Sequence, residues 1–178
     1  GIESPGIRAN PFGNAVPKSW ADLLKPEYKG EIQVANPASS GTAYTMVATL
    51  VQLMGEDKAF DYLKALHRNV GQYTRSGTGP IKAVARGETA VSISFVHDAP
   101  GEKMAGFPVE TVTPAEGTGA EIGSMSIIKG SRNLEAAKKF YEWALTPAAQ
   151  EMAAAAKQFQ LPSNKNAKVD PRVPDFKS

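Results

Sequence analysis

The sequence predicts an α/β domain with a mixed sheet flanked by helices. Three β-prone runs, at 31–35, 70–74 and 89–96, alternate with segments whose apolar residues recur at helical spacing. Strands that alternate with helices in this way are typical of a largely parallel or mixed sheet covered by helices. In such sheets ligands bind at the carboxyl ends of the strands, so the residues that follow each strand are the first candidates for a site.

Composition limits the size of the core and the classes of partner. The chain has 178 residues, of which 42% are hydrophobic, and this is enough for a core of one domain or somewhat more. Its 20 basic and 18 acidic residues nearly balance, and no run of Lys and Arg is long enough to indicate a nucleic-acid partner. No apolar run is long enough to span a bilayer. The absence of cysteine excludes disulfides, thiolate metal ligands and thiol nucleophiles.

The first two elements are short. Residues 1–17 contain three prolines and three glycines, which predicts an irregular lead-in with room for a short strand. Ser19 and Asp22 stand three residues apart, as in a capping box, at the start of a short helix that Pro26 ends. The run at 31–35 then predicts a strand.

The loop Asn36 to Thr42 joins this strand to a helix that ends at Gly55. The first turn of a helix leaves backbone N–H groups unpaired at the positive end of its dipole, so an anion is favoured there. Ser39, Ser40 and Thr42 add hydroxyl groups. The alternative interpretation is that Ser40 or Thr42 only caps the helix.

A second junction of the same kind follows the strand at 70–74. A helix is predicted over 56–67, then this strand, then Arg75-Ser76-Gly77-Thr78-Gly79-Pro80, and a helix that stops at Gly87. Proline suits the first helical turn because its missing N–H would have no partner there. Arg75, Ser76, Gly77 and Thr78 are therefore a second candidate anion-binding loop.

The third candidate is His97-Asp98, which directly follows the strand at 89–96. Adjacent residues of an extended strand point to opposite faces, so the two do not form the bonded pair of a catalytic triad. At the strand end both side chains could reach a polar ligand, with Asp98 accepting hydrogen bonds and His97 donating them. The alternative is an exposed loop histidine next to a helix-capping aspartate.

The remainder of the chain predicts a helical turn after Pro100, an edge strand at 107–112 and a Gly-rich loop at 114–121. Glu116 and Glu121 in this loop are candidate carboxylates that close over a ligand. Beyond it we expect a strand at 122–129, helices at 134–145 and 147–157, and an extended tail from 161. The apolar helical faces predict that Trp20, Phe60, Phe140 and Trp143 are core residues.

The residues do not favour a metal site, a cofactor or a catalytic centre. The chain has two histidines, His67 and His97, and no carboxylates clustered at ligand spacing, so no metal or cofactor is expected. No nucleophile-elbow, Walker A or dinucleotide motif is present, and we assign no catalytic residue. A phosphohydrolase that uses His97 and Asp98 is the enzymatic alternative.

Taken in order, several segments resemble the extracellular solute-binding proteins of ABC importers, of the ferric-iron, hexose-phosphate and 2-aminoethylphosphonate type. The resemblance rests on Ser19–Leu24, Tyr28–Gly30, Pro37–Thr42, Ser76-Gly77, Gly87–Val91, Pro114–Thr118 and Ala137–Gln150. It covers nearly the whole chain and implies a type II periplasmic-binding-protein-like fold with two lobes that close on the ligand.

The resemblance also implies how the chain is organised. Residues 1–120 resemble the C-terminal ligand-binding lobe, 121–160 a segment that returns to the N-terminal lobe, and 161–178 a C-terminal tail. The first part of the N-terminal lobe is missing from this pattern, so the chain resembles a fragment whose signal peptide lies upstream. The expected location is periplasmic, or extracellular and membrane-tethered. The expected partners are a small solute and an inner-membrane ABC permease, and an exposed lobe interface favours a dimer or a domain swap.

The ligand implied by the resemblance is a small phosphorylated or phosphonate solute, such as a sugar phosphate. Ferric members of the family have adjacent tyrosines just after the strand that here ends in Phe95-Val96-His97-Asp98, where this chain has none. A His-Asp pair with a downstream glutamate resembles the sugar-phosphate binders, and its spacing favours Glu121 over Glu116. The resemblance therefore assigns the two small-residue loops to the phosphate and His97, Asp98 and Glu121 to hydroxyl groups. Ferric-iron transport is the alternative, and a fragment without function is a third interpretation.

Overall fold

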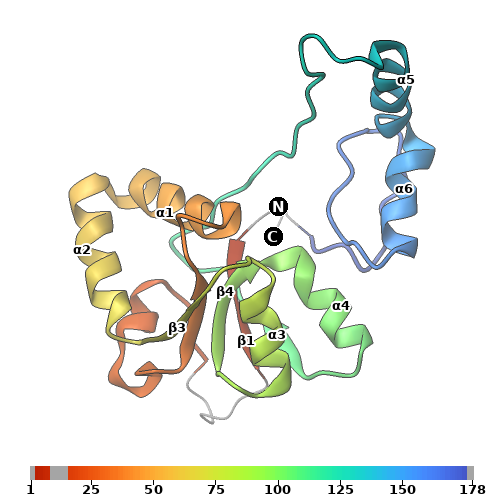
Figure 1. Ribbon diagram of the computed structural model, residues 1–178. Helices are drawn as coiled ribbons and strands as arrows, with labels where there is room; N and C mark the ends of the chain where they lie inside the picture. The colour runs from red at the N-terminus through yellow and green to blue at the C-terminus, as the bar shows by residue number, and fades with distance from the viewer. Residues whose placement is uncertain (1–2, 9–15, 176–178) are drawn as a thin grey trace. The chain divides into compact units, whose positions relative to one another are not determined.

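The computed structural model describes the backbone of residues 3–8 and all of residues 16–175 (Figure 1). The chain forms two compact units, one that ends at Glu121 and one that begins at Ile122. No helix in these described ranges is both long enough and apolar enough to cross a membrane.

The larger unit contains one mixed sheet with the strand order β3-β2-β4-β1-β5. Its strands are β1 (Glu3–Arg8), β2 (Ile32–Ala35), β3 (Val70–Thr74), β4 (Val91–Phe95) and β5 (Val109–Thr111). β2 pairs in parallel with both β3 and β4, whereas β1 pairs antiparallel with β4 and β5. The predicted mixed α/β sheet is confirmed. β1 corresponds to the short strand expected within residues 1–17.

Helices cover both faces of this sheet. They are α1 (Gly41–Met54), α2 (Glu56–His67), α3 (Gly79–Arg86) and α4 (Ala99–Met104), with 3-10 turns at Ala21–Leu24, Pro26–Tyr28 and Val96–Asp98. Figure 1 shows α1 and α2 on one side of the strands and α3 and α4 on the other. One buried cluster, which includes Met46, Leu50 and Ile93, lies under α1 and α2, and a second, which includes Ile81 and Val84, lies under α3 and α4. β2 is buried on both faces, as expected of a central parallel strand.

The first 3-10 turn begins much as predicted. The Asp22 N–H donates to Ser19 Oγ at 3.0 Å, and the Asp22 carboxylate accepts from the Lys18 N–H at 2.9 Å. In a standard capping box the carboxylate accepts from the capping residue itself, so the bond is displaced by one residue. Trp20 is buried, and its carbonyl accepts a hydrogen bond from the Tyr62 hydroxyl.

The smaller unit contains α5 (Leu134–Ala144) and α6 (Pro147–Ala155). Thr146 caps α6 by accepting from the Ala149 N–H at 3.3 Å. The tail returns along α6, where Gln150 accepts from the Asn164 N–H at 2.8 Å. Phe159 is fully buried, and the Arg172 guanidinium lies 5.0 Å from the centre of its ring.

Two predictions about the apolar residues are wrong. Residues 122–129 do not form a strand, and their side chains are exposed. Phe60, Phe140 and Trp143 are between 47% and 61% exposed, and of the four predicted core aromatics Trp20 alone is buried. Helical periodicity identifies an apolar face but does not show whether another element covers it.

The core under α1 predicts a strong contrast between two leucines of the same helix. Leu50 is fully buried, whereas Leu53 is 42% exposed. Leu50→Ala should lower the free energy of unfolding by about 3 kcal/mol because it removes buried methyl groups and leaves a cavity. Leu53→Ala, the matched control, should cost less than about 1 kcal/mol. Urea denaturation of both variants measures the difference, and equal losses would contradict the assigned core.

Candidate functional site

The parallel pairing of β2 with β3 and β4 brings three carboxyl ends to the same edge of the sheet. The loop after β2 contains Ser39 to Thr42, the loop after β3 contains Arg75 to Thr78, and β4 runs directly into His97 and Asp98. Because β2 lies between β3 and β4, its loop lies between the other two. The structure therefore places all three predicted groups along the edge where α/β sheets bind ligands.

The first two loops are in direct contact. A Cβ atom at Gly77 would overlap Thr42 Oγ1 and lie 2.9 Å from Ser40 Oγ, so the Gly77 backbone rests on these two side chains. On the other side, the Ser39 hydroxyl donates to the Arg75 carbonyl at 3.0 Å. Glycine is required at position 77 by this close approach, and the two junctions form one continuous surface.

Part of this hydroxyl set also has a structural role. Ser40 is the N-cap of α1 and accepts from the Ala43 N–H at 3.5 Å, so the capping interpretation holds for Ser40. Ser76 and Thr78 share a hydrogen bond of 3.1 Å, and Thr78 makes no side-chain cap to α3. Helix α1 is 14 residues long, and its first-turn N–H groups and dipole favour an anion beside these hydroxyls. Arg75 is exposed and adds positive charge to the same surface.

His97 and Asp98 lie in the 3-10 turn Val96–Asp98 that ends β4. His97 is only 7% exposed and stacks on Phe95, with ring centres 4.9 Å apart. Asp98 is the N-cap of α4 but makes no side-chain cap hydrogen bond. The interpretation of an exposed histidine beside a capping aspartate is therefore wrong for both residues.

His97 is buried and Asp98 is partly buried, and both have unused hydrogen-bonding capacity. His97 Nε2 lies 3.6 Å from Asp98 Oδ1, and within the described ranges His97 Nδ1 and Asp98 Oδ2 have no hydrogen-bond partner. Burial lowers the pKa of His97 to about 4. Burial also raises the pKa of Asp98 to about 6, although the Lys82 ammonium on α3 opposes this rise. Buried polar atoms are nearly always paired in native proteins, so these two atoms suit a polar ligand.

The two glutamates of the Gly-rich loop have different roles. The Glu116 carboxylate accepts from the backbone N–H groups of Trp20 at 3.1 Å and Ala21 at 3.3 Å, so it anchors the first 3-10 turn. Glu121 accepts from Thr45 Oγ1 at 3.2 Å and is thereby attached to the second turn of α1. Glu116 thus has a structural role, and Glu121 as a ligand contact stays a prediction.

Sequence reasoning missed Thr45 and Lys82. Thr45 lies one turn after Gly41 on α1, and Lys82 lies in the first turn of α3, three residues after Gly79. Polar residues on the first two turns of the helices that begin at this edge are the signal that would have identified both. Their contacts, a hydrogen bond from Thr45 to Glu121 and the effect of the Lys82 charge on Asp98, could not be recognised before the pairing of the strands was known.

Two other polar features do not form such a site. His67 Nδ1 lies 2.9 Å from the Tyr73 hydroxyl and the two rings stack, so His67 has a structural role at the surface. In the part of the chain that the structure describes, no group of three His, Cys, Asp or Glu side chains could hold a metal ion.

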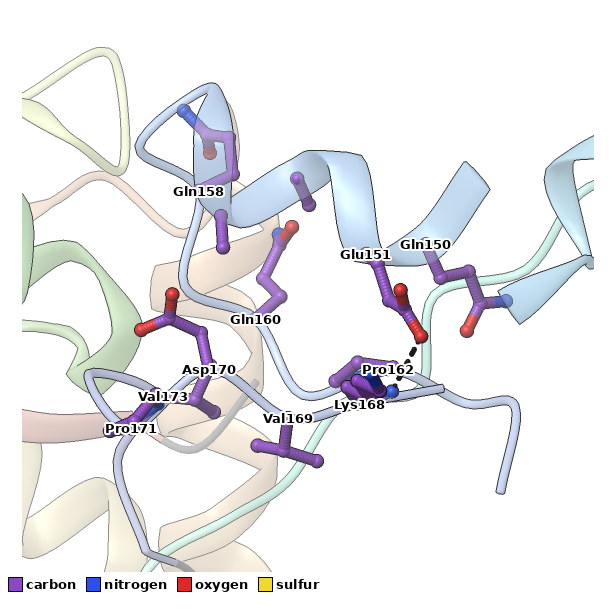
Figure 2. Close-up of a pocket in the computed structure, with 12 residues that line it drawn as sticks. Gln150, Glu151, Gln158, Gln160, Pro162, Lys168, Val169, Asp170, Pro171 and Val173 are labelled. Atoms are coloured by element: carbon purple, nitrogen blue, oxygen red, sulfur yellow. Dashed lines mark hydrogen bonds between the residues drawn. The ribbon is translucent and has the colours of Figure 1, made fainter. Parts of the chain in front are cut away.

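The smaller unit has a hollow of about 340 Å³ beside α6 (Figure 2). One of its polar groups, the Glu151 carboxylate, is already bound to the Lys168 N–H at 2.7 Å, and none of the predicted site residues lines it.

The two pKa shifts predict opposite effects of pH on stability for two substitutions. With a folded-state pKa of about 6, ionising Asp98 lowers stability as pH rises from about 4 to 6. His97 has a folded-state pKa of about 4, so between pH 4 and 6 its imidazole is more often protonated in the unfolded state than in the folded state. The contribution of His97 to stability therefore rises over the same interval. Relative to the unsubstituted chain, Asp98→Asn should gain about 2 kcal/mol from pH 4 to 6 and His97→Gln should lose a similar amount. Urea denaturation across this interval measures both, and slopes of the same sign would contradict the assignment.

Comparison with known proteins finds similar periplasmic binding proteins. The chain is 48% identical to the periplasmic binding protein AfuA from Actinobacillus pleuropneumoniae, solved with exogenous fructose-6-phosphate bound, with a TM-score of 0.94 over 99% of this chain and 57% of that chain. The periplasmic binding protein P5PA is 45% identical, with a TM-score of 0.90 over 98% of this chain and 56% of that chain. An uncharacterized protein of Haemophilus influenzae is 55% identical over 138 residues, which are 78% of this chain and 40% of that protein.

The chain thus spans about half the length of the proteins that it matches. The predicted periplasmic-binding-protein fold is confirmed by the two solved structures. The family model of the bacterial extracellular solute-binding proteins matches residues 9–177, nearly the whole chain. The chain therefore belongs to the bacterial extracellular solute-binding protein family.

Proposed function

We propose that this chain forms the ligand-binding part of an ABC-importer solute-binding protein that recognises a small phosphorylated sugar. The observation that carries the proposal is the contact of the Gly77 backbone with Ser40 and Thr42, which joins two anion-favouring loops into one surface. AfuA, which is 48% identical, was solved with a sugar phosphate bound. A phosphonate is the closest variant of the same ligand chemistry.

The phosphate is proposed to lie at the joined loops. Backbone N–H groups at the start of α1 and the hydroxyls of Thr42, Ser76 and Thr78 are donors suited to phosphate oxygens. Ser39 and Gly41 complete the first loop, and Arg75 supplies positive charge. A bare amine suits this surface poorly, because an ammonium group needs acceptors rather than donors.

The sugar is proposed to lie toward His97, Asp98 and Glu121. Asp98 Oδ2 accepts from a hydroxyl group, and His97 Nδ1 is another buried atom that has no hydrogen-bond partner among the described residues. The lowered pKa of His97 keeps its imidazole neutral near pH 7, so it recognises a hydroxyl without adding charge. Glu121 is fixed to α1 through Thr45 and supplies a further acceptor.

The wider role is proposed from the family. Residues 1–120 form the C-terminal ligand-binding lobe, 121–160 return to the other lobe, and 161–178 are its tail, so that the lobes close on the solute. The protein acts in the periplasm, without catalysis, and delivers the solute to an inner-membrane permease. The exposed Phe140 and Trp143 favour a covering partner, either the other lobe or a second copy of the chain.

Two rival functions lack comparable support. A ferric-iron transport protein would need metal ligands, but no tyrosine directly follows β4. Among the described residues, no group of three His, Cys, Asp or Glu side chains could hold a metal ion. A phosphohydrolase would need an activated nucleophile beside His97 and Asp98. The solved relatives AfuA and P5PA are both periplasmic binding proteins.

Calorimetric titration with fructose-6-phosphate and with inorganic phosphate tests the proposal. Asp98→Asn should weaken fructose-6-phosphate binding about tenfold, the effect of one lost charge-assisted hydrogen bond, and leave inorganic phosphate unchanged. Gly77→Ala should weaken both solutes because its Cβ would displace Thr42 and Ser40. Gly101→Ala, where a Cβ meets open space, is the control and should change neither.

Binding of ferric citrate without binding of any phosphate-containing solute would favour iron transport. Slow hydrolysis of the sugar phosphate that His97→Ala abolishes would favour the enzyme. A chain that binds no phosphate-containing solute would contradict the proposed function.

A further inference from the structure

Residues 115–121, here called the strap, are fixed to the larger unit along their first half. The Ala115 N–H donates to the Lys18 carbonyl at 2.9 Å. The Glu116 carboxylate holds the Trp20 and Ala21 N–H groups, and the Gly117 carbonyl accepts from the Trp20 indole N–H at 2.9 Å. Since Trp20 is 1% exposed, the strap is anchored on a core residue.

The second half of the strap lies against α1 at a glycine. A Cβ atom at Gly119 would overlap Thr49 Oγ1 and lie 3.2 Å from Thr49 Cβ. Gly119 does not have a positive φ angle, so the close approach itself requires glycine. Thr49 is 4% exposed and its hydroxyl donates to the Thr45 carbonyl at 2.8 Å, so this hydroxyl cannot move aside without breaking a bond.

The same turn of α1 holds the end of the strap. Thr45, whose carbonyl binds Thr49, uses its own hydroxyl to donate to Glu121 at 3.2 Å. Glu121 is therefore placed relative to α1 by a steric contact at Gly119 and by a hydrogen bond two residues later. The start of α1 also supplies the donors of the proposed phosphate site.

We propose that the Gly119–Thr49 contact is a positioning pair that sets the distance between the Glu121 carboxylate and the phosphate-binding start of α1. This inference rests on the proposed function. It predicts that the pair determines selectivity for a sugar phosphate over inorganic phosphate, because only the sugar extends from the start of α1 to Glu121. Neither residue of the pair touches the ligand itself.

The test adds a methyl group at position 119 and removes the side-chain hydroxyl at position 49. Gly119→Ala should lower fructose-6-phosphate affinity about tenfold and leave inorganic phosphate affinity unchanged. Thr49→Ala removes the hydroxyl that the new Cβ would overlap, so the double variant Gly119→Ala/Thr49→Ala should recover most of the lost affinity. In a Glu121→Ala background, Gly119→Ala should cause no further loss. Gly123→Ala, where a Cβ meets open space, is the matched control.

A second readout needs no ligand. Hydrogen exchange of the Trp20 indole N–H, followed by NMR, should become faster in Gly119→Ala and slow again in the double variant. Trp143 is 49% exposed and serves as the internal reference. An equal loss of both solutes in Gly119→Ala, or no recovery in the double variant, would overturn the positioning role.

The two proposals can fail separately. If the unsubstituted chain binds neither solute, the proposed function fails, and the selectivity role with it. If that chain binds fructose-6-phosphate but Gly119→Ala retains the full affinity, only the positioning role fails.

Discussion

The parallel pairing of β2 with β3 on one side and β4 on the other is the constraint on which the rest of the site depends. Each parallel connection requires a crossover, and here the crossovers are helices that begin at the carboxyl edge of the sheet. The starts of α1 and α3 and the turn at His97 are therefore brought to one edge by backbone hydrogen bonds. β2 is buried along its whole length, so its register is set by the packing of both faces.

Most of the architecture follows from local signals in the sequence. The bounds of α2 and β3 coincide with the predicted helix and strand, because Gly55 precedes α2 and Val70, Tyr73 and Thr74 favour a strand. The strand predicted at 122–129 failed because an apolar, β-prone run forms a strand only where another strand pairs with it. The prediction that Phe140 and Trp143 are core residues failed for a similar reason, because helical periodicity identifies an apolar face but not whether another element covers it.

The candidate site was predictable in position but not in detail. The strand-to-helix loops identified Ser39 to Thr42 and Arg75 to Thr78 as candidates, because ligand binding at the carboxyl ends of strands is a property of the fold class. The contact of Gly77 with Thr42 depends on tertiary geometry that no spacing reveals. The anchoring role of Glu116 likewise depends on a neighbour that is distant in sequence, since its carboxylate bonds to Trp20, 96 residues away.

The position of Glu121 links recognition to the organisation of the chain. It is the last residue of the larger unit, and Ile122 begins the smaller one. The strap before it is held by hydrogen bonds to Trp20 and by the close approach of Gly119 to Thr49. A contact between a ligand and Glu121 would therefore involve a residue that bonds to α1 and lies next to the boundary between the units. In the proposed function, the solute would therefore contact the chain at the residue where the larger unit ends.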